Sequence, residues 1–204
     1  MTLEPTGSIG PDRLAAVPDP ISSPGQRVLE TAARKGVSIE IVTFPESTHT
    51  AEEAAKAVGT TLGQIVKSLV FVAQRGDAEL EPYVVLVAGP DRVDLARLAA
   101  VLGEPSIRRA TAREARELTG FMIGGIAPFG HARPIRVVMD PGLGPHEVVW
   151  AAAGTQNTVF AVAPATLRML ANAVVAPIAA DLEAAETAPG GVGDPATAGN
   201  AAGA

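Results

Sequence analysis

One lysine stands inside a segment whose composition is that of a buried strand. Lys67 lies in the run IVKSLVFVA, residues 65–73, where nearly every neighbour is apolar. Side chains alternate along a strand, so Lys67 shares a face with Leu69 and Phe71. Lysine is seldom fully buried without a partner. Lys67 is therefore either a strand-end residue whose ammonium reaches water, or a functional cation that stabilises an oxyanion or binds phosphate at the mouth of a pocket.

A second candidate site is the glycine-rich segment TGFMIGGIAPFGH, residues 119–131. The pair Gly124 and Gly125 lets the backbone approach a ligand with no Cβ in the way, and their two N–H groups could point at a carbonyl oxygen. A branched side chain at Gly125 is then expected to damage catalysis more than folding. The segment matches neither a phosphate-binding loop nor a dinucleotide-binding loop. Since most glycine-rich segments are only turns, this one does not define a site by itself.

The segment AAAGTQNTVFAVAP, residues 151–164, predicts two strands joined by a tight turn from Gly154 to Asn157. As a site residue, Asn157 would offer a donor and acceptors to a substrate amine or carbonyl. The histidines are scattered, and only His131 lies next to a suspected site. No serine stands in a nucleophile-elbow pattern, and no serine–histidine–aspartate set is recognisable by spacing.

Composition excludes several classes of site. The chain has no cysteine, which rules out a disulfide scaffold, a thiol nucleophile and a cysteine-ligated zinc. With three histidines, a histidine-rich metal site is not expected either, and we expect no metal and no cofactor. No run is apolar over the roughly 18 residues that a membrane span needs. The first residues lack the basic-then-apolar order of a secretory signal. We therefore expect a soluble cytoplasmic protein.

The charge distribution limits the kind of nucleic-acid partner. The net charge is −6, but five of those six negative charges lie in the two ends of the chain, outside residues 26–181. The nearly neutral body can carry a local basic patch. It does not resemble a protein that grips a long stretch of phosphate backbone, so we expect no DNA partner.

Helices and strands that could position these residues follow from caps and periodicity. Capping boxes predict helices that begin near Ser23, Thr50 and Thr111, with glycines at their ends. Further helices are expected over 94–102 and after residue 164. Apolar runs predict strands over 37–45, 66–73, 83–88, 135–139, 148–152 and 158–162, with 74–82 as a polar connection. This order favours a single α+β, or mixed α/β, domain over a doubly wound sheet.

The two ends of the chain differ from this body. Residues 1–24 contain five prolines and no hydrophobic period, and residues 183–204 are largely alanine, glycine, proline and threonine. Both ends are predicted to be disordered tails. The folded domain is expected to span residues 25–182.

The order of the motifs resembles one family. A lysine within a strand, then GGIAPFGH, then an AAAGTQN turn before a strand and a proline is the order found in the YbaK / prolyl-tRNA-synthetase-associated (ProX-like) editing domains. The resemblance runs from about Arg27 to Ala180 and includes the segments HTAEEAA and VDLARLAAVLG. It implies a mixed β-sheet curled into a partial barrel and flanked by helices. It also implies hydrolysis of the ester that joins a wrong amino acid to tRNA, often the tRNA for proline.

The resemblance further implies roles for individual residues. Lys67, Gly124 and Gly125 would be catalytic. Substrate contacts would come from His49, Thr50, Pro128, Gly130, His131, Gly154 and Asn157. The implied partners are the acceptor end of a mischarged tRNA and prolyl-tRNA synthetase.

The sequence departs from the cysteine-removing members of that family. Phe44 stands in the region where they have a tyrosine, and the late turn is GTQN in place of their Gly-Gly-Lys type. The sequence is therefore equally compatible with a pocket for cysteine and with a pocket for another small amino acid such as alanine or serine.

The expected chemistry needs no strong nucleophile, because an aminoacyl ester is already activated. A lysine and glycine amides could suffice, since one well-placed oxyanion donor accelerates such reactions by roughly 10²–10³. Two other functions stay open. One is a non-catalytic module that binds the acceptor end of tRNA or a synthetase. The other is a hydrolase for another small acyl ester.

Overall fold

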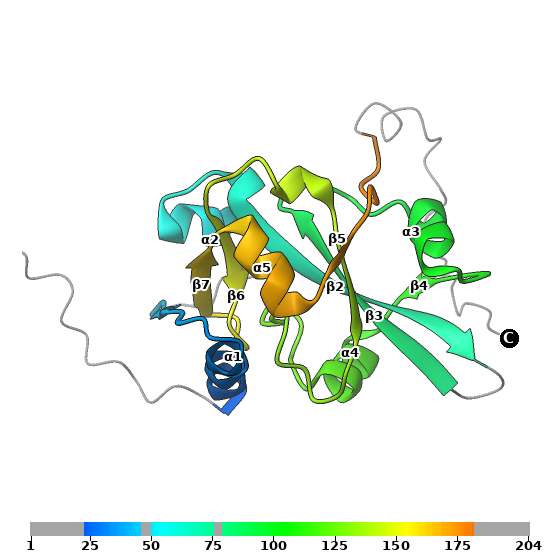
Figure 1. Cartoon of the computed structure of the whole chain (residues 1–204), viewed down its shortest axis with the longest axis horizontal. Coiled ribbons are helices and arrows are strands. Elements are labelled where there is room, and N and C mark those ends of the chain that lie inside the picture. The colour runs from blue at the N-terminus through cyan, green and yellow to red at the C-terminus, as the bar shows by residue number, and fades with distance from the viewer. Residues whose placement is uncertain (1–22, 46–49, 76–78, 182–204) are drawn as a thin grey trace, which may run out of the picture.

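A mixed sheet occupies the centre of the molecule in this computed structural model, which describes residues 23–45, 50–75 and 79–181 (Figure 1). Within these residues the sheet has eight strands, in the order β1-β7-β6-β2-β3-β5-β8, with β4 paired to β2 off this path. The strands are β1 (Ile41–Thr43), β2 (Ile65–Arg75), β3 (Glu79–Ala88), β4 (Arg108–Arg109), β5 (Arg136–Met139), β6 (Val149–Ala152), β7 (Thr158–Val162) and β8 (Val174–Val175). The path does not close on itself, so the sheet is open.

Five α-helices pack around this sheet in the described part of the chain. They are α1 (Ser23–Arg34), α2 (Ala51–Val58), α3 (Leu95–Leu102), α4 (Ala112–Thr119) and α5 (Pro164–Ala171). In Figure 1, α5 lies across the near side of the sheet, and α3 lies at the right. None of the described helices is long and apolar enough to cross a membrane. The expectation of a single mixed α/β domain is confirmed.

Helix boundaries follow the signals in the sequence. Thr50 accepts a hydrogen bond from the amide of Glu53, whose side chain bonds back to Thr50, and the same capping box forms at the start of α4. Gly59 ends α2 in the left-handed conformation, where a side chain would be strained. These local signals are sufficient because each cap involves residues at most four positions apart.

Both faces of the central strands are covered, which explains their long apolar runs. Val70 and Val72 of β2 belong to the main core, with residues of α1, α4 and α5. Phe71 and Ala73, on the opposite face, pack in a second cluster with Leu98 of α3.

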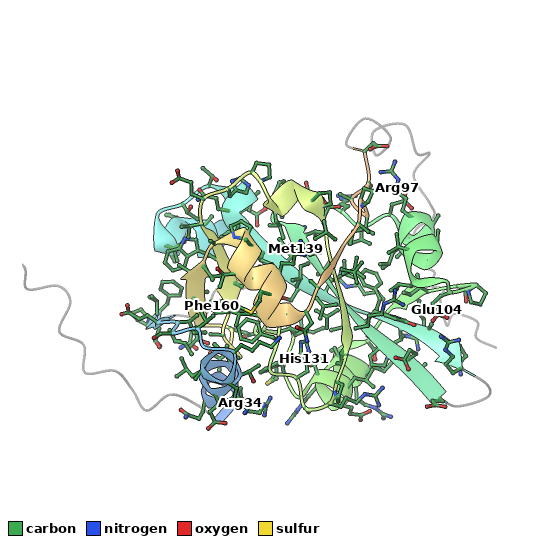
Figure 2. All side chains as sticks on the ribbon, in the orientation of Figure 1. Arg34, Arg97, Glu104, His131, Met139 and Phe160 are labelled. Atoms are coloured by element: carbon green, nitrogen blue, oxygen red, sulfur yellow. The ribbon has the colours of Figure 1, made fainter. Side chains whose placement is uncertain are left out.

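The β2–β3 hairpin is longer than predicted. The polar segment 74–82 was expected to be a connection, yet Arg75 and Glu79 are still paired. One cause is a buried carboxylate next to the hairpin. Glu104 is 7% exposed and accepts hydrogen bonds from the Tyr83 hydroxyl and the Arg75 guanidinium (Figure 2). This cluster anchors polar strand residues that hydrophobic periodicity does not detect.

Other strands also differ from expectation. The strand predicted over 37–45 is confined to β1, and Val37 and Ile39 pack against the core outside it. The two-residue strands β4 and β8 were not predicted. Pairing with a distant strand defines them, and so short a stretch shows no period of its own.

One edge of β2 is only partly paired. Along one side, β3 pairs with β2 from Val66 to Arg75. On the other side, β6 pairs with Ile65 and Val66, and β4 pairs with Phe71 and Val72. Figure 1 shows β6 and β4 at opposite ends of β2. The stretch 67–69 therefore has no neighbouring strand on this edge among the described residues.

Candidate functional site

A cavity of about 230 Å³ lies beside this open stretch of β2. Its wall includes residues of α2, β2, β4, α4, β6 and β7, and of the loops around residues 124 and 156. Most of the wall is apolar, with Ala54, Val58, Ile65, Ile126 and Trp150 among the lining residues. The polar residues of the wall include Lys67, Arg109, Thr155 and Gln156. A cavity of this kind suits a small ligand with a few polar groups.

Lys67 is a partly buried cation in this wall. Its Nζ donates a hydrogen bond to the backbone oxygen of Asp91. Burial lowers the pKa of Lys67, the negative charges of Asp91 and Glu52 oppose that change, and the positive charges of Arg109 and Arg92 add to it. The ammonium is thus held at the cavity by one acceptor and keeps donor capacity for a ligand.

The two glycines of the glycine-rich loop have different surroundings. Gly124 lines the cavity and has a φ of +87°, which L side chains rarely adopt. A Cβ at Gly125 would lie 2.6 Å from Cα of Thr155, so this glycine lets two loops pack backbone to backbone. The Gly125 amide donates to the oxygen of Met122 at 2.9 Å. The Gly124 amide has no acceptor among the residues that the structure describes.

Gln156 lines the cavity and connects these two loops. Its Nε2 donates to the oxygen of Ile123 at 2.9 Å. A Cβ added at Gly124 would lie only 2.9 Å from Cγ of Gln156, which is too close for an unstrained contact. The glycine at 124 therefore leaves room for the glutamine that joins the loops.

His131, at the end of the glycine-rich segment, is not among the residues that line the cavity. The His131 Nε2 is 2.9 Å from the oxygen of Ala127, and its ring meets that of Phe121 edge to face. Burial lowers the pKa of His131 to about 4, so the ring is neutral at neutral pH. His131, labelled in Figure 2, is half-buried. Gly130 packs against α1, and its oxygen accepts a hydrogen bond from Arg27. In this arrangement His131 shapes the loop.

Pro128, like His131, is not among the residues that line the cavity.

Two of the expected substrate contacts take part in packing between loops. A Cβ at Gly154 would lie 2.8 Å from Pro24, at the start of α1. The Asn157 side chain donates through Nδ2 to the backbone oxygen of Phe44 at 3.2 Å, and the backbone oxygen of Asn157 accepts from the Phe44 amide at 2.8 Å. The Asn157 side chain therefore attaches the turn to the end of β1.

The structure brings part of the expected set together at one cavity. Lys67, Gly124 and Thr50 line it, with Thr50 also capping α2. Gly125 and Asn157, which we expected to face the same space as Lys67, are not among the lining residues. His49 lies outside the described residues.

Sequence reasoning missed several residues of the wall. Arg109 belongs to the unpredicted strand β4, and Gln156 was treated only as part of a turn. The tripeptide Thr155–Gln156–Asn157 was the available signal, because three polar side chains in a tight turn exceed what a turn requires.

Comparison with known proteins identifies the family. Residues 45–170 match the model of the aminoacyl-tRNA editing domain. The uncharacterized protein YwhH of Bacillus subtilis is 31% identical over 128 residues, which are 63% of this chain and 78% of that protein. The multifunctional Ser/Thr-tRNA deacylase ProXp-y of Escherichia coli K12 is 30% identical over 116 residues, 57% of this chain and 68% of that protein.

A solved structure agrees with this assignment. It is described as that of a candidate trans-editing enzyme for prolyl-tRNA synthetase, with 42% identity and a TM-score of 0.72. The match covers 79% of this chain and all of that one. The architecture around the cavity and the sequence match over more than half of the chain lead to one assignment: the chain belongs to the family of aminoacyl-tRNA editing domains.

Proposed function

We propose that this chain is a trans-editing deacylase that hydrolyses the ester between a small amino acid and a mischarged tRNA, with the tRNA for proline as its main substrate. Family membership supports the reaction class. A relative named for deacylation of Ser/Thr-tRNA and a structural neighbour described as acting for prolyl-tRNA synthetase support the substrate class.

The observation that carries the proposal is that Lys67 and Gly124 line the same small cavity. In the proposed complex the amino-acid side chain enters the apolar part of the cavity, and its carbonyl lies near the open edge of β2. The amide of Gly124, which has no acceptor among the described residues, donates to the oxyanion as it forms, and the Lys67 ammonium stabilises the same charge or holds the terminal nucleotide. Water attacks the carbonyl carbon, either directly or after a group of the substrate has displaced the ester. The bond from that carbon to the ribose oxygen breaks and the oxygen takes up a proton, so the free amino acid and the tRNA hydroxyl are released.

The other partner contacts follow from this placement. The acceptor end of the tRNA reaches the cavity with its terminal nucleotide, and prolyl-tRNA synthetase is the second partner that we propose. Thr50, at the cavity wall, is a substrate contact, whereas Gly125, Pro128, Gly130, His131, Gly154 and Asn157 act by shaping the loops around it. The role of His49 stays a prediction.

A panel of mischarged tRNAs tests the proposal. The tRNA for proline would be charged with alanine, serine, threonine, cysteine or proline, and hydrolysis would be followed under single-turnover conditions. We expect hydrolysis of at least one small amino acid and little of proline. Tight binding of mischarged tRNA without hydrolysis of any ester would instead support the non-catalytic binding module.

A further inference from the structure

The two arginines of β4 have contrasting surroundings. Arg108 is paired with Glu114, its two terminal nitrogens donating to the two carboxylate oxygens at 2.9 and 2.7 Å. Arg109 is exposed, and within the described residues its side chain has no hydrogen-bond or ion-pair partner. Adjacent strand residues point to opposite faces, so the same two-residue strand presents one neutralised and one free guanidinium.

Strand register places Arg109 on the same face as Lys67. Arg109 lies directly opposite Phe71 of β2, and directly opposed residues project from the same face of a sheet. Phe71 and Lys67 are four positions apart on one strand and share that face. Arg109 also lines the cavity, and its positive charge is close enough to lower the pKa of Lys67. Two cations therefore border one largely apolar cavity.

The backbone that carries Arg109 is held in place on both sides. The amide of Ala110 donates to the oxygen of Val70 at 2.9 Å. On the other side, Glu114 holds Arg108 and also forms the capping box of α4 with Thr111. The backbone at Arg109 is therefore fixed before an anion binds. Less of the chain has to be ordered on binding, which lowers the entropy cost.

We propose that Arg109 binds the phosphodiester that joins the last two nucleotides of the substrate tRNA. This inference rests on the proposed function. An aminoacyl ester has no free carboxylate, so the nearest negative charge is the phosphodiester on the far side of the terminal ribose. A guanidinium matches phosphate oxygens with two parallel N–H donors. The bound anion would also relieve the repulsion between Arg109 and Lys67.

Substrates that differ in one phosphate test this role. The first is an aminoacyl-adenosine, which has no phosphate, and the second is the aminoacyl ester of the dinucleotide CpA, which has one. The measured quantity is the ratio of kcat/KM for the second over the first. We expect Arg109→Gln to lower this ratio about tenfold, as loss of a charged hydrogen bond predicts. On full tRNA, the slope of log kcat/KM against log salt should flatten by about 0.7.

Arg113→Gln is the matched control, because it removes an exposed arginine of α4 that is paired with Glu117 and does not line the cavity. It should leave the ratio and the salt slope as in the wild type. An unchanged ratio in Arg109→Gln, or an equal decrease in both variants, would overturn the inference.

A binding measurement separates this inference from the proposed function. Amide-linked analogues of the same two ligands cannot be hydrolysed, so their Kd reports the phosphate contact directly. If the wild type hydrolyses no ester, the proposed function fails. The phosphate contact is then still tested by the Kd values. It stands if Arg109→Gln weakens binding of the CpA analogue and not that of the adenosine analogue, and it fails otherwise.

Discussion

Lys67 combines a charge with a largely apolar environment because β2 changes its surroundings along its length. From Val70 to Ala73 both faces are covered by core clusters, whereas no described strand pairs with one edge of the stretch from Lys67 to Leu69. The lysine keeps one backbone acceptor, at Asp91, and burial lowers its pKa. Such a group responds strongly to a new negative charge, which is the property that stabilisation of an oxyanion requires.

Replacing Lys67 tests this role at the level of one side chain. Lys67→Ala should lower the single-turnover rate of deacylation at least tenfold, or about 1.4 kcal/mol in activation free energy. Lys67→Arg should restore little, because a planar guanidinium does not replace a compact ammonium in a small cavity. Thermal melts should show little change, since loss of the hydrogen bond to Asp91 is offset by removal of a partly buried charge. Lys56→Ala, on the exposed side of α2, is the control. A wild-type rate in folded Lys67→Ala would exclude the lysine from the chemistry.

His131 predicts a dependence of stability on pH. Its pKa is about 4 in the folded protein and about 6.5 in an unfolded chain, so the unfolded state binds the proton more tightly. The contribution to stability is present above pH 6.5 and is lost as the pH falls from about 6.5 to 4, by roughly 2–3 kcal/mol. Urea unfolding at several pH values measures this slope. His131→Gln keeps a donor for the Ala127 oxygen but cannot titrate, and it should flatten the curve in this window. An equal slope in both proteins would place the titrating group elsewhere.

At the scale of elements, the sequence predicted what depends on near neighbours. The caps at Thr50 and Thr111 and the strands β2, β5, β6 and β7 follow from local signals, and all were found. The strands β4 and β8 and the full length of the β2–β3 hairpin depend on distant partners such as Glu104, which no local pattern reveals.

The site was predictable to a similar degree. Composition and motif order singled out Lys67 and the glycine-rich loop, and both border the cavity. The contribution of each glycine was not predictable, because it depends on whether Thr155, Gln156 or open space faces the missing Cβ.

The two loop glycines give a prediction about the packing of elements. A Cβ at Gly125 meets the rigid backbone of Thr155, whereas at Gly124 it meets the end of the flexible Gln156 side chain. Gly125→Ala should therefore separate the loops and destabilise the fold by about 2 kcal/mol or more. Gly124→Ala should cost about 1 kcal/mol through its positive φ, with a larger effect on activity than on stability. Thermal melts and deacylation rates of both variants measure the contrast. This geometry changes the expectation from sequence alone, in which Gly125 mattered more for catalysis than for folding. A stable but inactive Gly125→Ala would restore that first expectation.

At the scale of the whole molecule, the last described segment closes the fold. Asp140 is 4% exposed, and its Oδ2 accepts hydrogen bonds from the amides of Ile178 and Ala179 at 2.9 and 2.8 Å. The Ile178 side chain is fully buried in the cluster beside α3. A backbone bridge joins Ala179 to Val93. The chain is thus held at residues 178–179 by contacts with elements far away in the sequence.

Two truncations should therefore behave very differently. A chain that ends at residue 182 loses only low-complexity sequence that lacks the hydrophobic period needed to offset its ordering entropy. Together with removal of residues 1–22, this change should leave the melting temperature and deacylation unaltered.

A chain that ends at residue 175 also loses burial of Ile178, about 1.5–3 kcal/mol, and leaves an oxygen of Asp140 buried without its donors, about 1–3 kcal/mol more. Because total stability is typically about 5–15 kcal/mol, the longer truncation should lower the urea midpoint substantially or prevent folding. Melts and urea titrations of the two chains measure the difference. Equal stability of both would show that the contacts of Asp140 do not hold the fold, and a loss of deacylation by the shorter truncation alone would assign the removed ends a role in tRNA binding.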